Sequence, residues 1–371
     1  MKVRRELNIP LYMQVYEALL EAIVEQKYAY GQYLPSEREL SESFDVDRLT
    51  VRRALDMLVS EGLVEKLAGR GSRVRDLPTT GANTPAESGD ARNLVFVMPE
   101  LPGRADRLTE PFNTRLFERV QESAKRLGYM LAYTRMRGSE SLEQTFRPHL
   151  PSGVLFVSEV EGALFDEAAR LGIPAVAINK HSEHFASVFS DRRHGSYVQV
   201  EHLVSMGHRR IILLNGEQSY LTAKLSLEGY RQAVQDHGLC ADDQIVVHSS
   251  WTFDAGYRAM LRLIDEHESL PSAVAASNDM IALGACEALK EHGFAVPGDV
   301  SVVGFDDIDQ LDYFSPKLTT IRSHIDLIAT AAWDLLIGAM MNAPAPRVET
   351  FVPTELVVRE STTVPKSPHE S

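Results

Sequence analysis

Two arginines and a threonine open a segment with helical periodicity, and these side-chain types suit contacts to DNA. Arg48 and Arg52 are four residues apart, so they share one face of a helix, and Thr50 lies between them in the chain. Asp47 precedes the segment and can cap its first turn. The apolar positions that would face inward are Val51, Leu55, Leu58 and Val59. Cationic and hydroxyl groups on such an outward face reach base edges and phosphates, which indicates a recognition helix.

The residues on either side of this helix fit the same interpretation. Ser36 can cap a preceding helix, with Glu39 three residues later. The apolar positions of that helix are Leu40 and Phe44. Residues 64–74 read as two short strands around the basic tip Gly69, Arg70 and Gly71. These segments predict a helix-turn-helix followed by a winged hairpin. The alternative is a helix-turn-helix fold that binds no DNA and whose arginines are only solvated.

Residues 9–75 resemble the GntR-type winged-helix family. The resemblance is carried by LPSEREL at 34–40, RLTVRRAL at 48–55 and the G-x-G of the hairpin tip. In that family an arginine of the first motif, two arginines of the recognition helix and the wing contact DNA. The DNA-binding set implied here is Arg38, Arg48, Thr50, Arg52, Gly69, Arg70 and Gly71. If the protein is a symmetric homodimer, its double-stranded operator should be an inverted repeat.

The charge of the chain supports DNA binding by one face only. The 371 residues carry a formal charge of −14. Residues 1–75 hold 12 basic and 12 acidic groups, so the whole excess of negative charge lies in the remainder. Residues 48–75 hold seven basic and three acidic groups. A basic patch on an acidic body favours specific sites, because the body repels other DNA.

Length, cysteine content and hydropathy limit the class of protein. The chain is long enough for two or three hydrophobic cores. Cys240 and Cys286 are isolated within apolar segments, so we expect neither a disulfide framework nor a zinc site. The sequence shows no signal-peptide pattern and no apolar run of about 18 residues or more, so we expect a cytoplasmic protein without a membrane span.

The composition changes sharply after the predicted wing. Residues 76–92 are rich in Pro, Gly, Thr, Ser and Ala and include one large apolar residue, which predicts a flexible linker. The domains expected are therefore a DNA-binding domain at 1–75, the linker at 76–92, a larger domain at 93–364 and a tail at 365–371.

The larger domain alternates strand-like and helical segments, which predicts an α/β fold with parallel sheets covered by helices. Strand-like runs occur at 94–98, 129–134, 153–157, 174–178, 210–214, 244–248, 273–276 and 300–304. Helical segments lie at 113–127, 161–171, 195–206, 226–238, 254–267 and 279–292. Folds of this kind bind ligands at the carboxyl ends of their strands.

Residues 93–364 resemble the effector-binding core of the LacI/GalR regulators, which is similar to periplasmic sugar-binding proteins. The motifs are VEHLVSMGHRRIILLNG at 200–216, SNDMIALGACEALKEHG at 277–293, VPGDVSVVGFDDI at 296–308, LTTIR at 318–322 and ELVVREST at 355–362. The resemblance implies two α/β lobes joined by three crossovers, with the ligand in the cleft between them. It assigns 93–190 and 325–350 to the first lobe, and 191–322 with the tail to the second.

The same resemblance implies an effector pocket. Trp251 matches the aromatic that stacks on a sugar or base, and Asn278 and Asp306 match positions that hydrogen-bond ligand hydroxyls. Further candidates are Asn179, Phe112 and Asn113, with Asp191 and Ser323 as weaker ones near the crossovers. The competing structural roles are a core or rim tryptophan at 251, a helix cap at 278 and a turn at 306.

One position departs from the family pattern. The family has an arginine three residues before the glycine of its R-x-x-G-[FY] element, whereas this chain has Ser226 before Gly229 and Tyr230. Lys224 is a candidate substitute for the missing cation, or it points to solvent. We therefore include Lys224 and Ser226 among the candidate effector residues.

These observations predict a transcription regulator controlled by a small, sugar-like effector, most simply a repressor that needs no cofactor. An enzyme is the second class, because winged helices of this type also fuse to pyridoxal-phosphate domains. However, the sequence holds no nucleophile elbow, P-loop, metal spacing or dinucleotide motif. The same sequence is also compatible with a regulator that answers to a protein partner or a non-sugar ligand, and with an activator.

Overall fold

The computed structural model describes residues 11–24, 27–28, 31–60, 64–67, 71–74, 92–101, 106–267, 269–341 and 347–366. The chain divides into two compact units, Met1–Asp90 and Ala91–Ser371. All but Arg92 of the predicted linker lies outside the described residues, as do Gly69 and Arg70 of the predicted wing tip.

The described residues of the first unit form three helices and a hairpin, as expected. Its elements are α1 (Leu11–Val24), α2 (Glu37–Phe44), α3 (Arg48–Ser60), β1 (Val64–Leu67) and β2 (Gly71–Val74). Ser36 and Glu39 form the predicted capping box at the start of α2. At the start of α3, the Thr50 amide donates to Asp47 Oδ1 at 2.7 Å. The buried core includes Val15, Leu19, Leu40, Phe44, Val51, Leu55 and Leu58.

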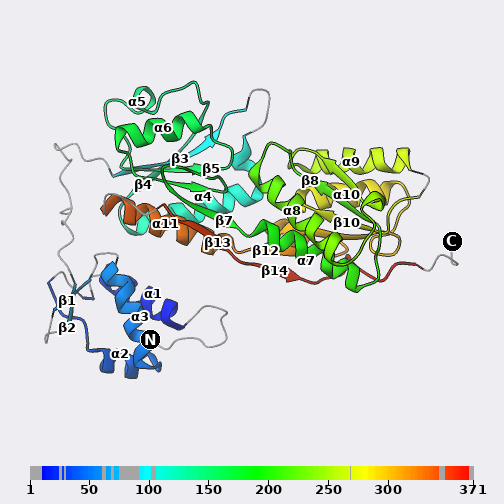
Figure 1. Ribbon diagram of the computed structural model, residues 1–371. Helices are drawn as coiled ribbons and strands as arrows, with labels where there is room; N and C mark the ends of the chain where they lie inside the picture. The colour runs from blue at the N-terminus through cyan, green and yellow to red at the C-terminus, as the bar shows by residue number, and fades with distance from the viewer. Residues whose placement is uncertain are drawn as a thin grey trace. The chain divides into compact units, whose positions relative to one another are not determined.

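The second unit begins with a six-stranded parallel sheet that forms lobe one, in the order β13-β7-β6-β5-β3-β4. Its strands are β3 (Asn93–Pro99), β4 (Met130–Met136), β5 (Gly153–Val157), β6 (Ala175–Ile178), β7 (Ala186–Ser190) and β13 (Glu349–Val352). The helices α4 (Pro111–Arg126) and α11 (Ile325–Met341) cover one face, while α5 (Leu142–Thr145) and α6 (Gly162–Leu171) cover the other (Figure 1). The short helix η1 (Arg107–Thr109) precedes α4.

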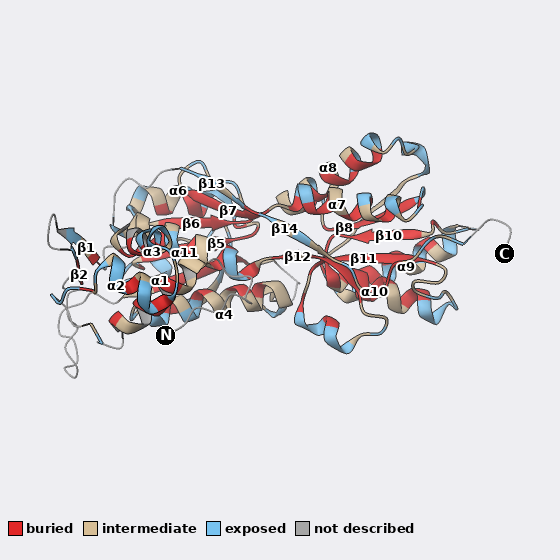
Figure 2. Ribbon diagram, turned by 90° about the horizontal axis from the view of Figure 1, so that it is seen from below, coloured by how far each residue is buried: buried red, intermediate tan, exposed pale blue. Residues whose placement is uncertain are grey.

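Lobe two is a second six-stranded sheet, in the order β14-β12-β11-β10-β8-β9, parallel except for β14. Its strands are β8 (Ile211–Asn215), β9 (Ile245–His248), β10 (Ala273–Ala276), β11 (Ser301–Asp306), β12 (Thr319–Ser323) and β14 (Thr354–Val357). The helix pairs are α7 (Arg192–Ser205) with α8 (Leu221–Asp236), and α9 (Phe253–Glu266) with α10 (Asp279–Glu291); η2 (Ala241–Asp243) and η3 (Asp309–Tyr313) are short helices. Figure 2 shows the inner strands of both sheets buried, as helix-covered parallel strands must be.

Three short crossovers join the lobes. The chain passes from β7 to α7 through Asp191, from β12 to α11 through His324, and from β13 to β14 through Pro353. Each lobe is therefore assembled from separate stretches of sequence, and the predicted fold class is confirmed. In the second unit, the strands and helices expected from the sequence did not include β7, β12, β13, β14, α5 and α11. The expected helix at α8 began at residue 226, whereas α8 begins at Leu221.

No described helix is both long and apolar enough to cross a membrane.

Candidate functional site

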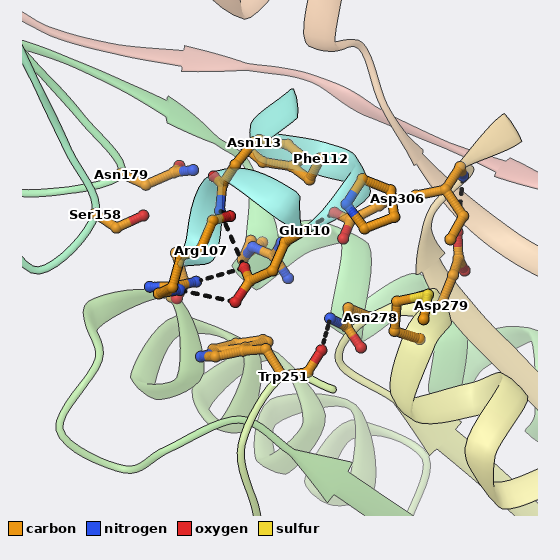
Figure 3. Close-up of a pocket in the computed structure, with 15 residues that line it drawn as sticks. Arg107, Glu110, Phe112, Asn113, Ser158, Asn179, Trp251, Asn278, Asp279 and Asp306 are labelled. Carbon is orange, nitrogen blue, oxygen red and sulfur yellow. Dashed lines mark hydrogen bonds and ion pairs between the residues drawn. The ribbon is translucent and has the colours of Figure 1, made fainter. Parts of the chain in front are cut away.

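A cavity of about 500 Å³, its open mouth included, is lined by residues from both lobes (Figure 3). Lobe one contributes Arg107, Glu110, Pro111, Phe112, Asn113, Ser158 and Asn179. Lobe two contributes Arg192, Thr222, Trp251, Asn278, Asp279, Met280, Asp306 and Ile308. Many of these residues end a strand or lie within three residues after one, the position at which open α/β sheets bind ligands.

Trp251 follows β9 and is only 6% exposed. Its ring meets Tyr220 edge-on at a centroid distance of 6.1 Å, and the Arg192 guanidinium lies 5.6 Å from its centroid. Its Nε1–H is buried and has no hydrogen-bond partner within the described part of the chain. Buried indole N–H groups usually find a partner, so this donor suits an acceptor on a ligand.

Asn278 lies in the cavity and also has a structural role. It is the N-cap of α10, where its Oδ1 accepts from the Ile281 amide at 2.8 Å. Its Nδ2 donates to the Trp251 carbonyl at 2.9 Å, as the dashed line in Figure 3 shows. The helix-cap role is therefore real, and Asn278 holds the loop that carries the tryptophan.

Asp306 ends β11 and pairs with Arg192 at the start of α7. Arg192 Nη2 donates to Asp306 Oδ1 at 3.0 Å, and both side chains are about 5% exposed. The Ser323 hydroxyl donates to the same oxygen at 3.2 Å. Burial raises the pKa of Asp306 to about 6, although the contacts with Arg192 and Ser323 lower it. Asp306 also adopts φ +110°, a conformation that L-residues rarely take, which is typical of functional sites.

Asp279, beside Asn278, is a lining residue that the sequence interpretation did not include. Its carboxylate accepts from the Thr320 hydroxyl at 2.5 Å and from the Ile308 amide at 3.0 Å. Burial and the neighbouring Asp306 raise its pKa well above the ordinary value. Asp279 therefore ties α10 to β12 and to the loop after β11.

Arg107 and Glu110 are two further lining residues that periodicity did not reveal. Arg107 Nε and Nη2 donate to the two carboxylate oxygens of Glu110, each at 2.9 Å. Asn113 fixes this pair, because its Nδ2 donates to the Arg107 carbonyl and to Glu110 Oε2, each at 3.0 Å. The predicted residue Asn113 thus lines the cavity and holds Arg107 and Glu110 in position (Figure 3).

The other predicted residues divide into two groups. Phe112 and Asn179 line the cavity, and Asn179 is 4% exposed with φ +57°. Lys224 and Ser226 are not among the described residues that line it. Lys224 is exposed, while Ser226 is fully buried.

The interpretation of Lys224 as a substitute cation is therefore corrected. The helix α8 begins five residues earlier than expected, so Thr222 near its N-terminus reaches the cavity, and Ser226 lies one turn further away. The cations at the cavity are Arg192 and Arg107, supplied by α7 and by η1 of lobe one. Arg192 directly follows the crossover residue Asp191, which was the one signal in the sequence that could have indicated it.

The first unit presents the predicted DNA-contact residues at its surface. Arg38, Arg48 and Arg52 are exposed. Arg52 forms a two-pronged ion pair with Glu37, with Nη2 and Oε2 at 2.8 Å, and Arg38 pairs with Glu42 at 3.0 Å. Exposed pairs of this kind are weak, so both arginines can exchange carboxylate for phosphate.

Two other predicted contact residues have defined local roles. The Thr50 hydroxyl bonds to Asp47 at 3.0 Å at the start of α3. Gly71 opens β2 with φ +91°, a conformation that glycine adopts at no steric cost.

Comparison with known proteins matches both units. Residues 11–74 match the model of bacterial regulatory proteins of the gntR family, and residues 200–362 match that of the periplasmic binding protein-like domain. The HTH-type transcriptional regulator MalR of Streptomyces coelicolor is 32% identical over 271 residues, covering 69% of this chain and 78% of that protein.

Two solved structures are similar to the second unit. A LacI family transcriptional regulator from Enterococcus faecium with bound ribose superposes with a TM-score of 0.66 at 23% identity, over 74% of this chain and 100% of that one. The dimeric Lac repressor superposes with a TM-score of 0.64 at 25% identity, over 74% of this chain and 100% of that one.

The winged-helix unit, the two-lobed unit with its cavity and these relationships lead to one conclusion. The chain belongs to the LacI/GalR family of HTH-type transcription regulators, with a GntR-type DNA-binding domain at its N-terminal end.

Proposed function

We propose that this regulator is a cytoplasmic repressor of carbohydrate-utilisation genes, released from its operator by a sugar-like effector. The observation that carries the proposal is the cavity between the lobes, in which the Trp251 ring and the Arg192–Asp306 pair come together. An aromatic face packs on the apolar face of a sugar ring, while fixed polar groups orient its hydroxyls. The similar structure from Enterococcus faecium, which contains ribose, supports the same class of ligand.

The assignment of residues to the effector follows from position and chemistry. Trp251, Asp306, Asn179 and Phe112 are proposed to contact the effector directly. Asn113 and Asn278 are proposed to position the groups around the effector, because Asn113 bonds to Glu110 and Asn278 bonds to the Trp251 carbonyl. We infer no catalytic role for the cavity and no cofactor in it.

Contacts across the cleft provide the means by which the effector would act. Glu159 of lobe one accepts from the Leu221 amide of lobe two at 2.9 Å, and Arg115 pairs with Asp309 at 3.0 Å. A ligand bound by both lobes stabilises this closed arrangement relative to an open one. A coupling of about 1–3 kcal/mol between effector and operator would change operator affinity about 5–150-fold.

The DNA side of the proposal uses Arg38, Arg48, Arg52 and the wing. A homodimer would hold two such units on an inverted repeat of double-stranded DNA. The similarity to the dimeric Lac repressor supports this assembly.

The test has two stages. A thermal-shift screen of monosaccharides on the full chain should yield a ligand that raises the melting temperature. That ligand should then release the protein from its operator in an electrophoretic mobility shift titration. Stabilisation without any change in operator affinity would argue against effector control, and stronger operator binding would reverse the sign of regulation.

A further inference from the structure

The cations that line the cavity are each paired with a carboxylate. In lobe one, Arg107 is held by Glu110 through two bonds of 2.9 Å. In lobe two, Arg192 is held by Asp306 at 3.0 Å. Within the described part of the chain, these are the two cations of the cavity lining. The remaining ionisable residue of the lining is Asp279, and any charge on it would be negative. The cavity therefore has no surplus positive charge.

The Arg107–Glu110 pair is a built part of the site. The two side chains are only 13% and 23% exposed, and both carboxylate oxygens are engaged. Asn113, itself 2% exposed, bonds to both partners, as the dashed lines in Figure 3 show. The guanidinium also lies 5.1 Å from the ring centroid of Tyr220 in the other lobe. Asn113 and Tyr220 thus hold the pair in place, unlike a solvent-exposed ion pair whose partners move freely.

The cavity nevertheless offers hydrogen-bond donors. Arg107 Nη1, Arg192 Nε and Trp251 Nε1 are buried N–H groups that have no hydrogen-bond partner in the described part of the chain. Such groups are costly unless a ligand satisfies them, so they favour a ligand with several acceptor oxygens. Hydroxyl and ring oxygens meet this requirement without adding charge. A carboxylate or phosphate also would, but it would bring a negative charge that the cavity does not balance.

We propose that Glu110 is a specificity-determining residue: by neutralising Arg107, it reserves the cavity for uncharged, hydroxyl-rich effectors and excludes the corresponding sugar acids and sugar phosphates. Arg107 remains a donor through Nη1, but its charge is not available to a ligand. This inference rests on the proposed function, since it concerns the ligand of the same site.

The experiment compares matched ligands on matched variants of the full chain. Isothermal titration uses three pairs: D-galactose with D-galacturonate, D-glucose with D-glucuronate, and D-ribose with D-ribose 5-phosphate. The wild type should bind the uncharged member of at least one pair at least about tenfold more tightly than its anionic counterpart. Glu110→Gln raises the net charge of the cavity by one unit, because Arg107 loses its paired carboxylate. That variant should shift the ratio by about tenfold or more in favour of the anion.

Two further variants separate charge from fold. The control Glu122→Gln lies in α4, the helix that begins directly after Glu110. It removes a carboxylate that pairs with Arg119 and is not part of the cavity lining. It should leave the ratio unchanged. Arg107→Gln combined with Glu110→Gln removes both charges together, so the preference for the uncharged ligand should persist even if affinity falls. Melting temperatures of all variants identify any that fail to fold. If Glu110→Gln does not fold, the preference of the double variant tests the role of Glu110.

The outcomes distinguish this inference from the proposed function. If the wild type binds neither member of any pair, the sugar effector is wrong and the inference falls with it. If the wild type binds a sugar but Glu110→Gln leaves the ratio of affinities unchanged, only the role of Glu110 is overturned. The same holds if the wild type itself binds the anion more tightly than the sugar. A double variant that prefers the anion would also overturn it.

Discussion

Gly216 lies directly against the ring of Trp251, so closely that a Cβ on Gly216 would overlap the indole carbon Cζ2. Gly216 follows β8, and Trp251 follows the neighbouring strand β9. A side chain larger than hydrogen at 216 must therefore displace the ring from its present position. The position of the aromatic surface depends on the smallest residue of the adjacent loop.

The first prediction concerns this contact. Gly216→Ala should weaken effector binding about tenfold or more, because the displaced ring no longer presents the same surface to the ligand, while operator affinity without effector stays unchanged. Calorimetry with the effector identified by screening measures the loss. Gly162→Ala at the start of α6, where a Cβ meets open space, is the control and should retain wild-type affinity. Equal affinities for both variants would show that the ring has room to move.

The second prediction tests whether Trp251 serves the effector or the core. Trp251→Phe keeps an aromatic face but loses the Nε1 donor, so effector affinity should fall while operator binding persists. Trp251→Ala should abolish the effector response in a protein that still binds operator. A core tryptophan would behave differently, costing about 3–5 kcal/mol of stability and both activities together.

Trp333 provides the matched control for that comparison. It lies in α11, is 8% exposed and packs in the core of lobe one. Trp333→Phe should lower the melting temperature with little effect on effector affinity. Mobility shift titrations with and without effector, alongside thermal melts, separate the two kinds of tryptophan.

The third prediction concerns DNA. Arg52→Ala should weaken specific operator binding by about 1–3 kcal/mol, the usual cost of losing one base-reading arginine. Glu37→Gln removes the ion-pair partner of Arg52 and leaves the arginine in place, so operator binding should be retained or strengthened. Mobility shift titrations at one salt concentration measure both. An Arg52→Ala protein with wild-type affinity would remove this residue from the interface.

The fourth prediction uses the raised pKa of Asp306, about 6 against an ordinary value of 3.8. Between about pH 4 and about pH 6, the folded protein therefore keeps a proton on Asp306 that the unfolded chain has already released. As the pH rises through this window, the folded state loses relative stability, by about 1 kcal/mol between pH 5 and pH 6. Above about pH 7, where Asp306 is ionised in both states, the contribution no longer changes.

Asp306→Asn removes this contribution and supplies the comparison. The difference in melting temperature between the wild type and the variant should therefore change between pH 5 and pH 6 and be constant from about pH 7 to about pH 8. As the pH rises, the melting temperature of the wild type should fall relative to that of Asp306→Asn. A difference that is independent of pH would mean that Asp306 titrates near its ordinary value, held ionised by Arg192.

Much of this protein could be predicted from local pattern. Ser36, Glu39 and Asp47 determine where two helices begin, because capping depends on residues three apart in the chain. The apolar runs at 153–157 and 273–276 match β5 and β10 residue for residue, because strands buried on both faces need continuous apolar sequence. Trp251, Asn278 and Asp306 were predicted from the resemblance to the LacI/GalR core, and each ends a strand or lies two or three residues after one.

The tertiary structure alone decided how the cavity is charged. Arg107 and Glu110 lie in a short segment without apolar periodicity, and Arg192 and Asp306 are 114 residues apart in the chain. Ser226 stands where the family has an arginine, yet the cations of the cavity are Arg107 of η1 and Arg192 of α7 rather than the nearby Lys224. Periodicity reports which faces are buried, whereas a charged group in a cleft is placed by the packing of two lobes. That packing joins segments distant in sequence, so no local pattern carries it.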